Sequence, residues 1–365
     1  MGALFALGFR PLYLLAGGYS ALSVAVWTLQ YAGWLPVANM LWHAHEMLFG
    51  YAFAVIAGFL LTAVRNWTGL PTPAGGALAA IAALWIVARV AAFYSLPAAA
   101  LADALFALGV AWGIGRPLIA SGNRRNWFFI PLVLALGGAS IAFQAYPQLG
   151  ISVGLDVVLL VMTVVAGRVV PAFTNNAVPG AGARRNQALE YATLASVVTL
   201  LFLDAFQLPV AVIALVASAL HAARLALWAP LKTRGKPILW ILHVSYAWIV
   251  AHLVLRGLAA FDVVPAVLAT HALAVGAIGG LTLGMMTRTS RGHTARPLTT
   301  GPAELAAYAL VQAAAVVRVL GPLVLPGAYA ATIGLSALLW SAAFAVFTVA
   351  YFPILSRPRL DGQPG

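Results

Sequence analysis

The feature that most constrains this chain is a series of long apolar stretches, each close to the length of a membrane-crossing helix. Such a helix needs about 20 mainly apolar residues to cross about 30 Å of hydrocarbon. The stretches are rich in Ala and Leu without period-two alternation, which favours helices over the strands of a membrane barrel. We therefore expect an all-α fold, a polytopic membrane bundle of about twelve transmembrane helices that forms a single integral membrane domain over residues 1–365. The predicted spans are 12–32, 40–64, 75–95, 98–118, 127–145, 150–173, 188–206, 208–229, 237–257, 264–288, 303–322 and 327–354.

Composition excludes a soluble protein and several cofactor chemistries. Hydrophobic residues make up 63% of the sequence and charged residues 8%, which is more apolar surface than a water-soluble fold can bury. The net charge of +12 comes mainly from Arg in short polar gaps, so we expect phospholipid headgroups rather than nucleic acid as the anionic partner. Cysteine is absent, which excludes disulfides, thiolate metal sites and covalently attached c-type haem. A metal must therefore be bound by His, Met or carboxylate groups.

The positions of the basic residues predict how the chain is oriented. Lys and Arg accumulate in cytoplasmic loops. With twelve spans and both termini in the cytoplasm, most of the 20 Lys and Arg residues fall on the cytoplasmic side. An odd number of spans would destroy this sorting, so the charge distribution favours an even number with both termini cytoplasmic.

Ionisable residues inside the spans are costly to bury and therefore identify candidate sites. Arg89 and Asp103 lie at equal distances in sequence before and after Leu96, where two predicted spans meet. A tight hairpin would place them at one depth, so we interpret them as a structural ion pair, with a role in transport as the alternative. Asp156 has no partner nearby in sequence. It is a candidate to orient a ligating histidine, to carry protons or to pair with a distant residue.

Histidines are the other informative group. A rise of about 1.5 Å per residue places four of them in the outer third of the bilayer. His221 and His243 fall in the inner third, and His293 lies in a cytoplasmic loop. Several imidazoles at one depth favour a metal or haem site, and the alternative is a set of ordinary hydrogen-bonded core histidines. The four outer histidines are His43, His45, His252 and His271.

Helix geometry separates the roles of the two histidines in the second span. At 100° per residue, His43 and His45 point about 200° apart and should have different partners. His43 shares a face with Glu46 and Gly50, and Gly50 leaves room for a flat macrocycle or for a neighbouring helix. His45 is a metal ligand or a hydrogen-bond donor to a backbone carbonyl or an acidic group. In the tenth span, His271 faces away from a stripe of small residues that allows another helix to approach closely, namely Gly276, Gly280 and Gly284.

Several long motifs are distributed over nearly the whole chain. They are GFRP at 8–11, WHAHEMLFGY at 42–51, GFLLTA at 58–63, NWTG at 66–69, GRVVPAFTNN at 167–176, LHVSYAW at 242–248, and a segment at 271–294 that contains MTR and GHT. Together, these motifs resemble the NnrS family. His221 and His252 match no motif of that family, whereas five histidines lie within its motifs: His43, His45, His243, His271 and His293.

The resemblance implies a multi-pass protein of the bacterial inner membrane that contains haem b and copper. It also implies a role in denitrification and in the response to nitric oxide and nitrosative stress, with nitric oxide or another small gas as a partner. The resemblance identifies no electron donor, and it leaves open whether the protein is an enzyme, a nitric oxide-related oxidoreductase. The cofactor-binding candidates are His43, His45, His243 and His271, and the metal candidates are His43, His45, Glu46, His252 and His271. Residues expected to support these ligands or to bind haem propionates are Arg10, Asn66, Asp156, Arg168 and Arg256.

A secondary transporter, proton-coupled or of another kind, is the alternative interpretation. Twelve spans with both termini inside are a common carrier arrangement, and buried charges of carriers form substrate or proton paths. In this interpretation the histidines are structural, no cofactor is bound, and the path is formed by Arg89, Asp103 and Asp156.

Overall fold

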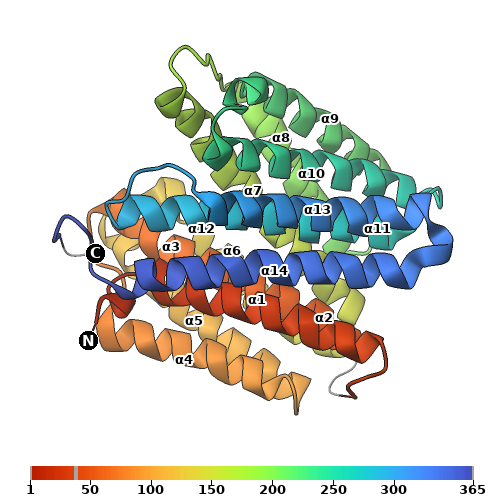
Figure 1. Ribbon diagram of the computed structural model, residues 1–365, viewed down its shortest axis with the longest axis horizontal. Coiled ribbons are helices and arrows are strands. Elements are labelled where there is room, and N and C mark those ends of the chain that lie inside the picture. Colours follow the sequence, from red (N-terminus) through yellow and green to blue (C-terminus); the bar gives the residue numbers. More distant parts are fainter. Residues whose placement is uncertain (1, 37–39, 364–365) are drawn as a thin grey trace. The chain divides into compact units, whose positions relative to one another are not determined.

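The structure, a computed structural model, describes residues 2–36 and 40–363. Within these residues every regular element is a helix (Figure 1). The α-helices are α1 (Phe9–Tyr31), α2 (Met40–His45), α3 (Phe53–Thr68), α4 (Gly75–Ala91), α5 (Leu96–Ala120), α6 (Phe129–Ala145), α7 (Pro147–Ala177), α8 (Gln187–Ala205), α9 (Ala211–Leu227), α10 (Pro237–Ala259), α11 (Ala266–His271), α12 (Gly280–His293), α13 (Pro302–Val324) and α14 (Tyr329–Ser356). Two π-helical segments, Glu46–Ala52 and Ala272–Gly279, join α2 to α3 and α11 to α12. Short 3-10 helices lie at Ala3–Phe5, Arg124–Asn126, Pro230–Thr233 and Pro326–Ala328.

The helices confirm the predicted polytopic bundle. In the described part of the chain, ten helical segments are long and apolar enough to cross a membrane, and α4 and α9 are shorter apolar helices. Each predicted apolar stretch corresponds to one of these twelve segments. The third stretch ends earlier than predicted because the chain turns after Ala91, and Ser95 then caps α5 by accepting a hydrogen bond from the Ala98 amide. The chain is therefore a multi-pass membrane protein.

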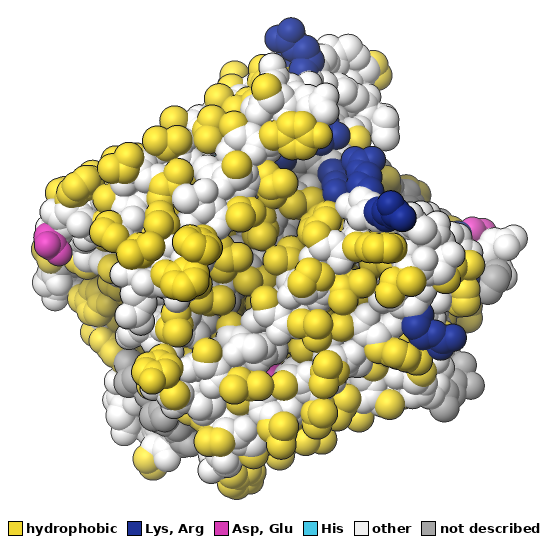
Figure 2. Space-filling model, turned by 180° about the vertical axis from the view of Figure 1, so that it is seen from behind, with side chains coloured by type: hydrophobic (Ala, Val, Ile, Leu, Met, Phe, Trp, Pro, Cys, Tyr) yellow, Lys and Arg dark blue, Asp and Glu magenta, His cyan; other side chains and the backbone are white. Residues whose placement is uncertain are grey.

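The surface of the helices agrees with burial in lipid. Figure 2 shows a face that is covered mainly by hydrophobic side chains. Leu101, Val212, Leu338 and Val349 are between 62% and 76% exposed. In water such an apolar surface would promote association, whereas the hydrocarbon layer solvates it.

Residue contacts divide the chain into two compact units. Unit 1 comprises Met1–Val157, Arg288–Pro297 and Phe347–Gly365, and unit 2 comprises Val158–Thr287 and Leu298–Val346. One π-helical segment lies in each unit, directly after His45 in unit 1 and directly after His271 in unit 2. Segments of this kind are rare, and many occur at functional sites. Both units therefore contain a helix whose regular geometry is interrupted beside a histidine.

Within unit 1, the beginning of α1 lies against the end of α14. The buried side chain of Arg10 donates hydrogen bonds from Nη1 to the carbonyl oxygens of Leu355 and Arg357, at 2.9 Å and 2.8 Å. These carbonyls are among those that a helix terminus leaves without an intrahelical partner. The contact places the first and last long helices of the chain at the same end of unit 1, as an even number of spans requires.

Within unit 2, the glycine stripe of the tenth span packs against α10. A methyl group on Gly276 would lie 2.5 Å from Cδ2 of Trp248, and one on Gly280 would lie 2.8 Å from Cβ of Ser245. Any larger side chain at these positions would push the two helices apart. The helix that packs closely against the glycine stripe is therefore α10, which carries His243 and His252.

Candidate functional site: a buried charge cluster and anchored histidines

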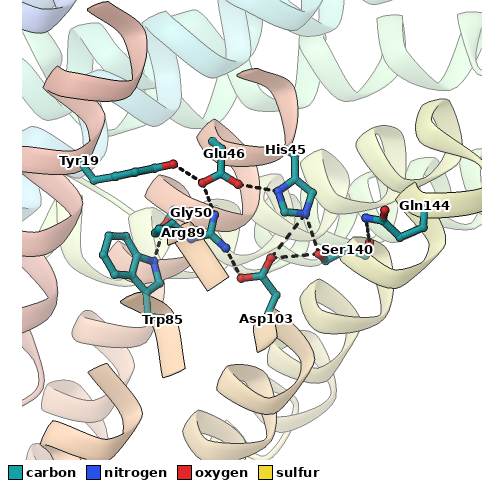
Figure 3. Close-up of polar contacts among 9 residues, drawn as sticks. All are labelled: Tyr19, His45, Glu46, Gly50, Trp85, Arg89, Asp103, Ser140 and Gln144. Atoms are coloured by element: carbon teal, nitrogen blue, oxygen red, sulfur yellow. Dashed lines mark hydrogen bonds and ion pairs between the residues drawn. The ribbon is translucent and has the colours of Figure 1, made fainter. Parts of the chain in front are cut away.

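Unit 1 encloses a group of polar side chains that we call the charge cluster. Its members converge from six segments of the fold, α1, α2, the first π-helical segment, α4, α5 and α6 (Figure 3). Charged groups in an apolar bundle require partners because desolvation of an isolated charge is costly. In the same order, the members are Tyr19, His45, Glu46, Arg89, Asp103 and Ser140.

Arg89 lies between two carboxylates. Its Nη1 donates to Oε2 of Glu46 at 2.7 Å, and its Nη2 donates to Oδ1 of Asp103. The hydroxyl of Tyr19 donates to the same oxygen of Glu46. Both carboxylates are fully buried and the arginine is 3% exposed. One guanidinium is thus shared by two acidic groups out of contact with water.

His45 connects the two carboxylates on the other side. Its Nδ1 lies 2.7 Å from Oε1 of Glu46, and its Nε2 lies 3.1 Å from the hydroxyl of Ser140 and 3.5 Å from Oδ2 of Asp103. Both ring nitrogens are therefore occupied by acidic or hydroxyl groups of the cluster. Of the two roles considered for His45, this geometry supports a hydrogen bond to an acidic partner, and it leaves no ring nitrogen for a metal.

The π-helical segment and Gly50 make room for Arg89. A methyl group on Gly50 would lie 2.6 Å from Nη1 and 3.2 Å from Cδ of Arg89. The carbonyl of Gly50 accepts a hydrogen bond from Nε1 of Trp85 at 2.9 Å, and the guanidinium carbon lies 5.7 Å from the centre of the Trp85 ring. The space that Gly50 leaves on its helix is thus filled by the arginine side chain from α4.

Position in sequence is enough to place Arg89 and Asp103 together, but it does not identify their other partners. Their opposition across the turn at Leu96 follows from hairpin geometry, and the structure pairs them. Glu46 is a metal candidate from the sequence, although a second intramembrane carboxylate is also a signal for a second partner of the arginine. Tyr19 and Ser140 carry no comparable signal, since neutral hydroxyls are common within spans.

Unit 2 contains three histidines with a common hydrogen-bonding arrangement, which we call the anchored histidines. In each, Nδ1 hydrogen-bonds to a backbone carbonyl: His243 to Leu239 at 3.1 Å, His252 to Ala269 at 2.8 Å and His271 to Val267 at 2.7 Å. A carbonyl can only accept, so Nδ1 carries the proton. A neutral ring then presents its lone pair at Nε2, which is the form in which imidazole binds metals.

The surroundings of Nε2 differ among the anchored histidines. In His252 this nitrogen is buried and has no hydrogen-bond partner. In His243, Nε2 lies 3.3 Å from the hydroxyl of Thr174. The side chain of His271 is half-buried. His252 on α10 and His271 on α11 are both anchored to carbonyls of α11 that lie two residues apart, at Ala269 and Val267. The structure therefore brings these two predicted metal candidates to one part of unit 2.

A second polar network in unit 2 was not assigned to any site from the sequence. The guanidinium of Arg224 binds both carboxylate oxygens of Glu190, at 2.8 Å and 2.5 Å, and donates to the hydroxyl of Tyr246 at 3.1 Å. That hydroxyl lies 2.7 Å from Nδ1 of His221, whose Nε2 is buried without a hydrogen-bond partner. A two-point arginine–carboxylate contact fixes the geometry of the groups around it. The network therefore ties α8, α9 and α10 together.

The structure distributes the remaining predicted residues over separate places. The ring of His43 stacks on Trp27 at 4.3 Å, so His43 and His45 have different partners, and His293 packs on Phe9 at 5.5 Å. Arg256 pairs with Asp204. Asn66 is exposed, Arg168 is half-buried and Asp156 is buried.

Comparison with known protein families supplies the context for these sites. The family model of the NnrS protein matches residues 3–359, which is nearly the whole chain. The chain belongs to the NnrS family. A search of curated proteins found no match. The charge cluster, the anchored histidines and the Arg224 network all lie within residues 3–359, which the family model matches.

Among the described residues, no group of three or more His, Asp or Glu side chains is placed to hold a metal ion. Haem iron needs fewer ligands from the protein, because the macrocycle supplies four of them and the protein would supply one or two. One or two of the anchored histidines would be enough to supply these ligands.

Proposed function

We propose that this chain is a haem- and copper-binding protein of the bacterial inner membrane that binds nitric oxide in the response to nitrosative stress. Membership in the NnrS family suggests a membrane protein of the nitric oxide stress response. The observation that carries the metal-binding part is Nε2 of His252, a buried imidazole nitrogen in the ligand-presenting form with no hydrogen-bond partner. A polar atom of this kind normally has a partner, so a bound group would complete it.

His252 and His271 are the residues that we propose as ligands. Their hydrogen bonds to α11 fix the tautomer and the orientation of each ring, which raises the basicity of Nε2. Imidazole suits both iron and copper, and the absence of cysteine leaves imidazole as the main ligand type for copper. When bound, haem iron supplies a coordination position for a small gas. The surrounding chain buries His252, and the carbonyls of α11 hold both rings in place.

The test is an absorption spectrum of the full-length protein in detergent, oxidised, dithionite-reduced and exposed to nitric oxide, with iron and copper measured on the same sample. We expect a Soret band that shifts with nitric oxide. His252→Ala and His271→Ala should each lose most of that band if they bind haem, or most of the copper if they bind copper. The matched control is His221→Ala, which removes an equally buried imidazole whose Nδ1 is bound to Tyr246 instead of a carbonyl.

A colourless, metal-free preparation from cells supplied with haem and copper would contradict the proposal. Retention of the spectrum and of both metals in His252→Ala and His271→Ala would contradict the ligand assignment alone.

A proton-coupled transporter is the second candidate function, and the charge cluster of unit 1 is the observation that favours it. Intramembrane carboxylates and histidines that pair with one another are typical of proton relays in pumps and carriers. This candidate gains support if the metal-free outcome is found together with substrate uptake that depends on a proton gradient in liposomes.

A further inference from the structure

The buried charges of the charge cluster must balance, and the hydrogen bonds of the cluster indicate which group provides the balancing charge. His45, Glu46, Asp103 and Ser140 are all 0% exposed. The rings of Phe49 and Phe143 flank the imidazole of His45 at 5.1 Å and 5.2 Å, so its surroundings are apolar apart from the cluster itself. A net charge in such an environment is strongly unfavourable.

Counting charges shows that one more positive group is needed. Ionised Glu46 and Asp103 carry two negative charges, and Arg89 carries one positive charge. Tyr19 from α1 and Ser140 from α6 complete the polar groups of the cluster and are neutral as hydroxyls. The cluster is neutral only when it holds one additional proton.

The hydroxyl of Ser140 indicates where that proton is. With both carboxylates ionised, the single hydrogen of this hydroxyl is donated to Oδ2 of Asp103 at 3.1 Å, so its oxygen accepts from Nε2 of His45. Nδ1 of His45 faces a carboxylate oxygen of Glu46, which also accepts. In this arrangement both ring nitrogens act as donors, which requires an imidazolium.

We propose that the charge cluster is a proton-binding site within the spans, in which His45 holds one proton between Glu46 and Asp103. The bound proton makes the cluster neutral, and its retention depends on both carboxylates. Loss of either negative charge leaves the other balanced by Arg89, so the proton then leaves His45 as the neutral imidazole forms. This site is independent of the proposed haem and copper site, whose ligands lie in unit 2.

Nitrogen-15 NMR of the full-length protein in lipid bilayers tests the proposal. His45–Glu46 is the only His–Glu pair in the sequence, so histidine labelled uniformly with carbon-13 and nitrogen-15, together with glutamate labelled with nitrogen-15, identifies His45 through its peptide bond to Glu46 and carries that assignment to its ring nitrogens without a substitution. The sample is held at about pH 8, where an ordinary histidine is mostly neutral. We expect both ring nitrogens of His45 to give the chemical shifts of a protonated imidazolium. A neutral ring, with one protonated and one unprotonated nitrogen, would overturn the proposal.

Variants then test the dependence on charge. Glu46→Gln and Asp103→Asn should each convert His45 to the neutral form. Ser140→Ala keeps every charge and should leave the imidazolium in place, so it tests the proposal even if a carboxylate variant does not fold. The control Asp204→Asn removes an acidic partner of Arg256 in unit 2 and should not change His45. An imidazolium that persists in both carboxylate variants would also overturn the proposal.

Discussion

Replacement of Arg89 by leucine is expected to destabilise the protein by about 3–5 kcal/mol, because it leaves two buried carboxylates without their shared cation. The measurement is the free energy of unfolding in a detergent titration, followed by tryptophan fluorescence. The control is Arg116→Leu, which removes an exposed arginine whose guanidinium lies 5.5 Å from the centre of the Trp112 ring. That change should cost about 1 kcal/mol or less.

A further variant separates the loss of charge balance from the loss of packing. Combining Arg89→Leu with Glu46→Gln and Asp103→Asn removes all three permanent charges of the cluster. Neutral amides are far less costly to bury than unpaired carboxylates, so this variant should recover part of the lost stability. If Arg89→Leu is no less stable than Arg116→Leu, the cluster does not stabilise unit 1 in the way that its geometry indicates.

Replacement of Gly167 by alanine is expected to be the second most damaging change, at about 2–5 kcal/mol. Gly167 lies on α7, and a methyl group there would overlap Nη2 of Arg224 and lie 2.6 Å from both Cζ of Arg224 and Oε2 of Glu190. The added carbon cannot be accommodated unless the two-point contact between arginine and carboxylate is broken. The same unfolding titration measures the effect.

Gly138 provides the matched control for this substitution. It lies within α6, and a methyl group there would meet no atom within 4 Å. Because alanine has a higher helix propensity than glycine, Gly138→Ala should be neutral or stabilising by up to about 1 kcal/mol. Equal stability of the Gly167→Ala and Gly138→Ala proteins would show that Arg224 moves aside without loss.

Local sequence was enough to predict the spans but not the partners of the buried charges. Hydropathy depends on runs of neighbouring residues, so each predicted stretch has a helix in the structure. The pairing of Arg89 with Asp103 was also accessible, because the turn at Leu96 relates their depths. Glu46 reaches Arg89 across 43 positions of sequence, and no periodicity within one helix contains that information.

The histidines illustrate the same limit. Their predicted depth in the membrane groups His252 with His43, His45 and His271. Depth does not determine which helices are neighbours or which way a side chain points. The structure commits both nitrogens of His45 to the charge cluster and stacks His43 on Trp27, whereas His252 and His271 share anchors on α11. Which nitrogen of a ring stays available depends on carbonyls and carboxylates from other helices, and the sequence of a single span does not contain them.

The π-helical segment Glu46–Ala52 determines how a change in the length of its helix would act on the charge cluster. Each residue of a regular helix advances the direction of the following side chains by about 100°. A π-helical segment turns less per residue than an α-helix, so the residues of Glu46–Ala52 span about the same rotation as one residue fewer in a regular helix. Deleting one residue inside the segment, such as Leu48, would therefore favour a regular α-helix that keeps Glu46 facing Arg89. The same deletion in a helix without such a segment would turn every preceding side chain by about 100°. A deletion within Glu46–Ala52 should thus leave the direction of the cluster residues largely unchanged.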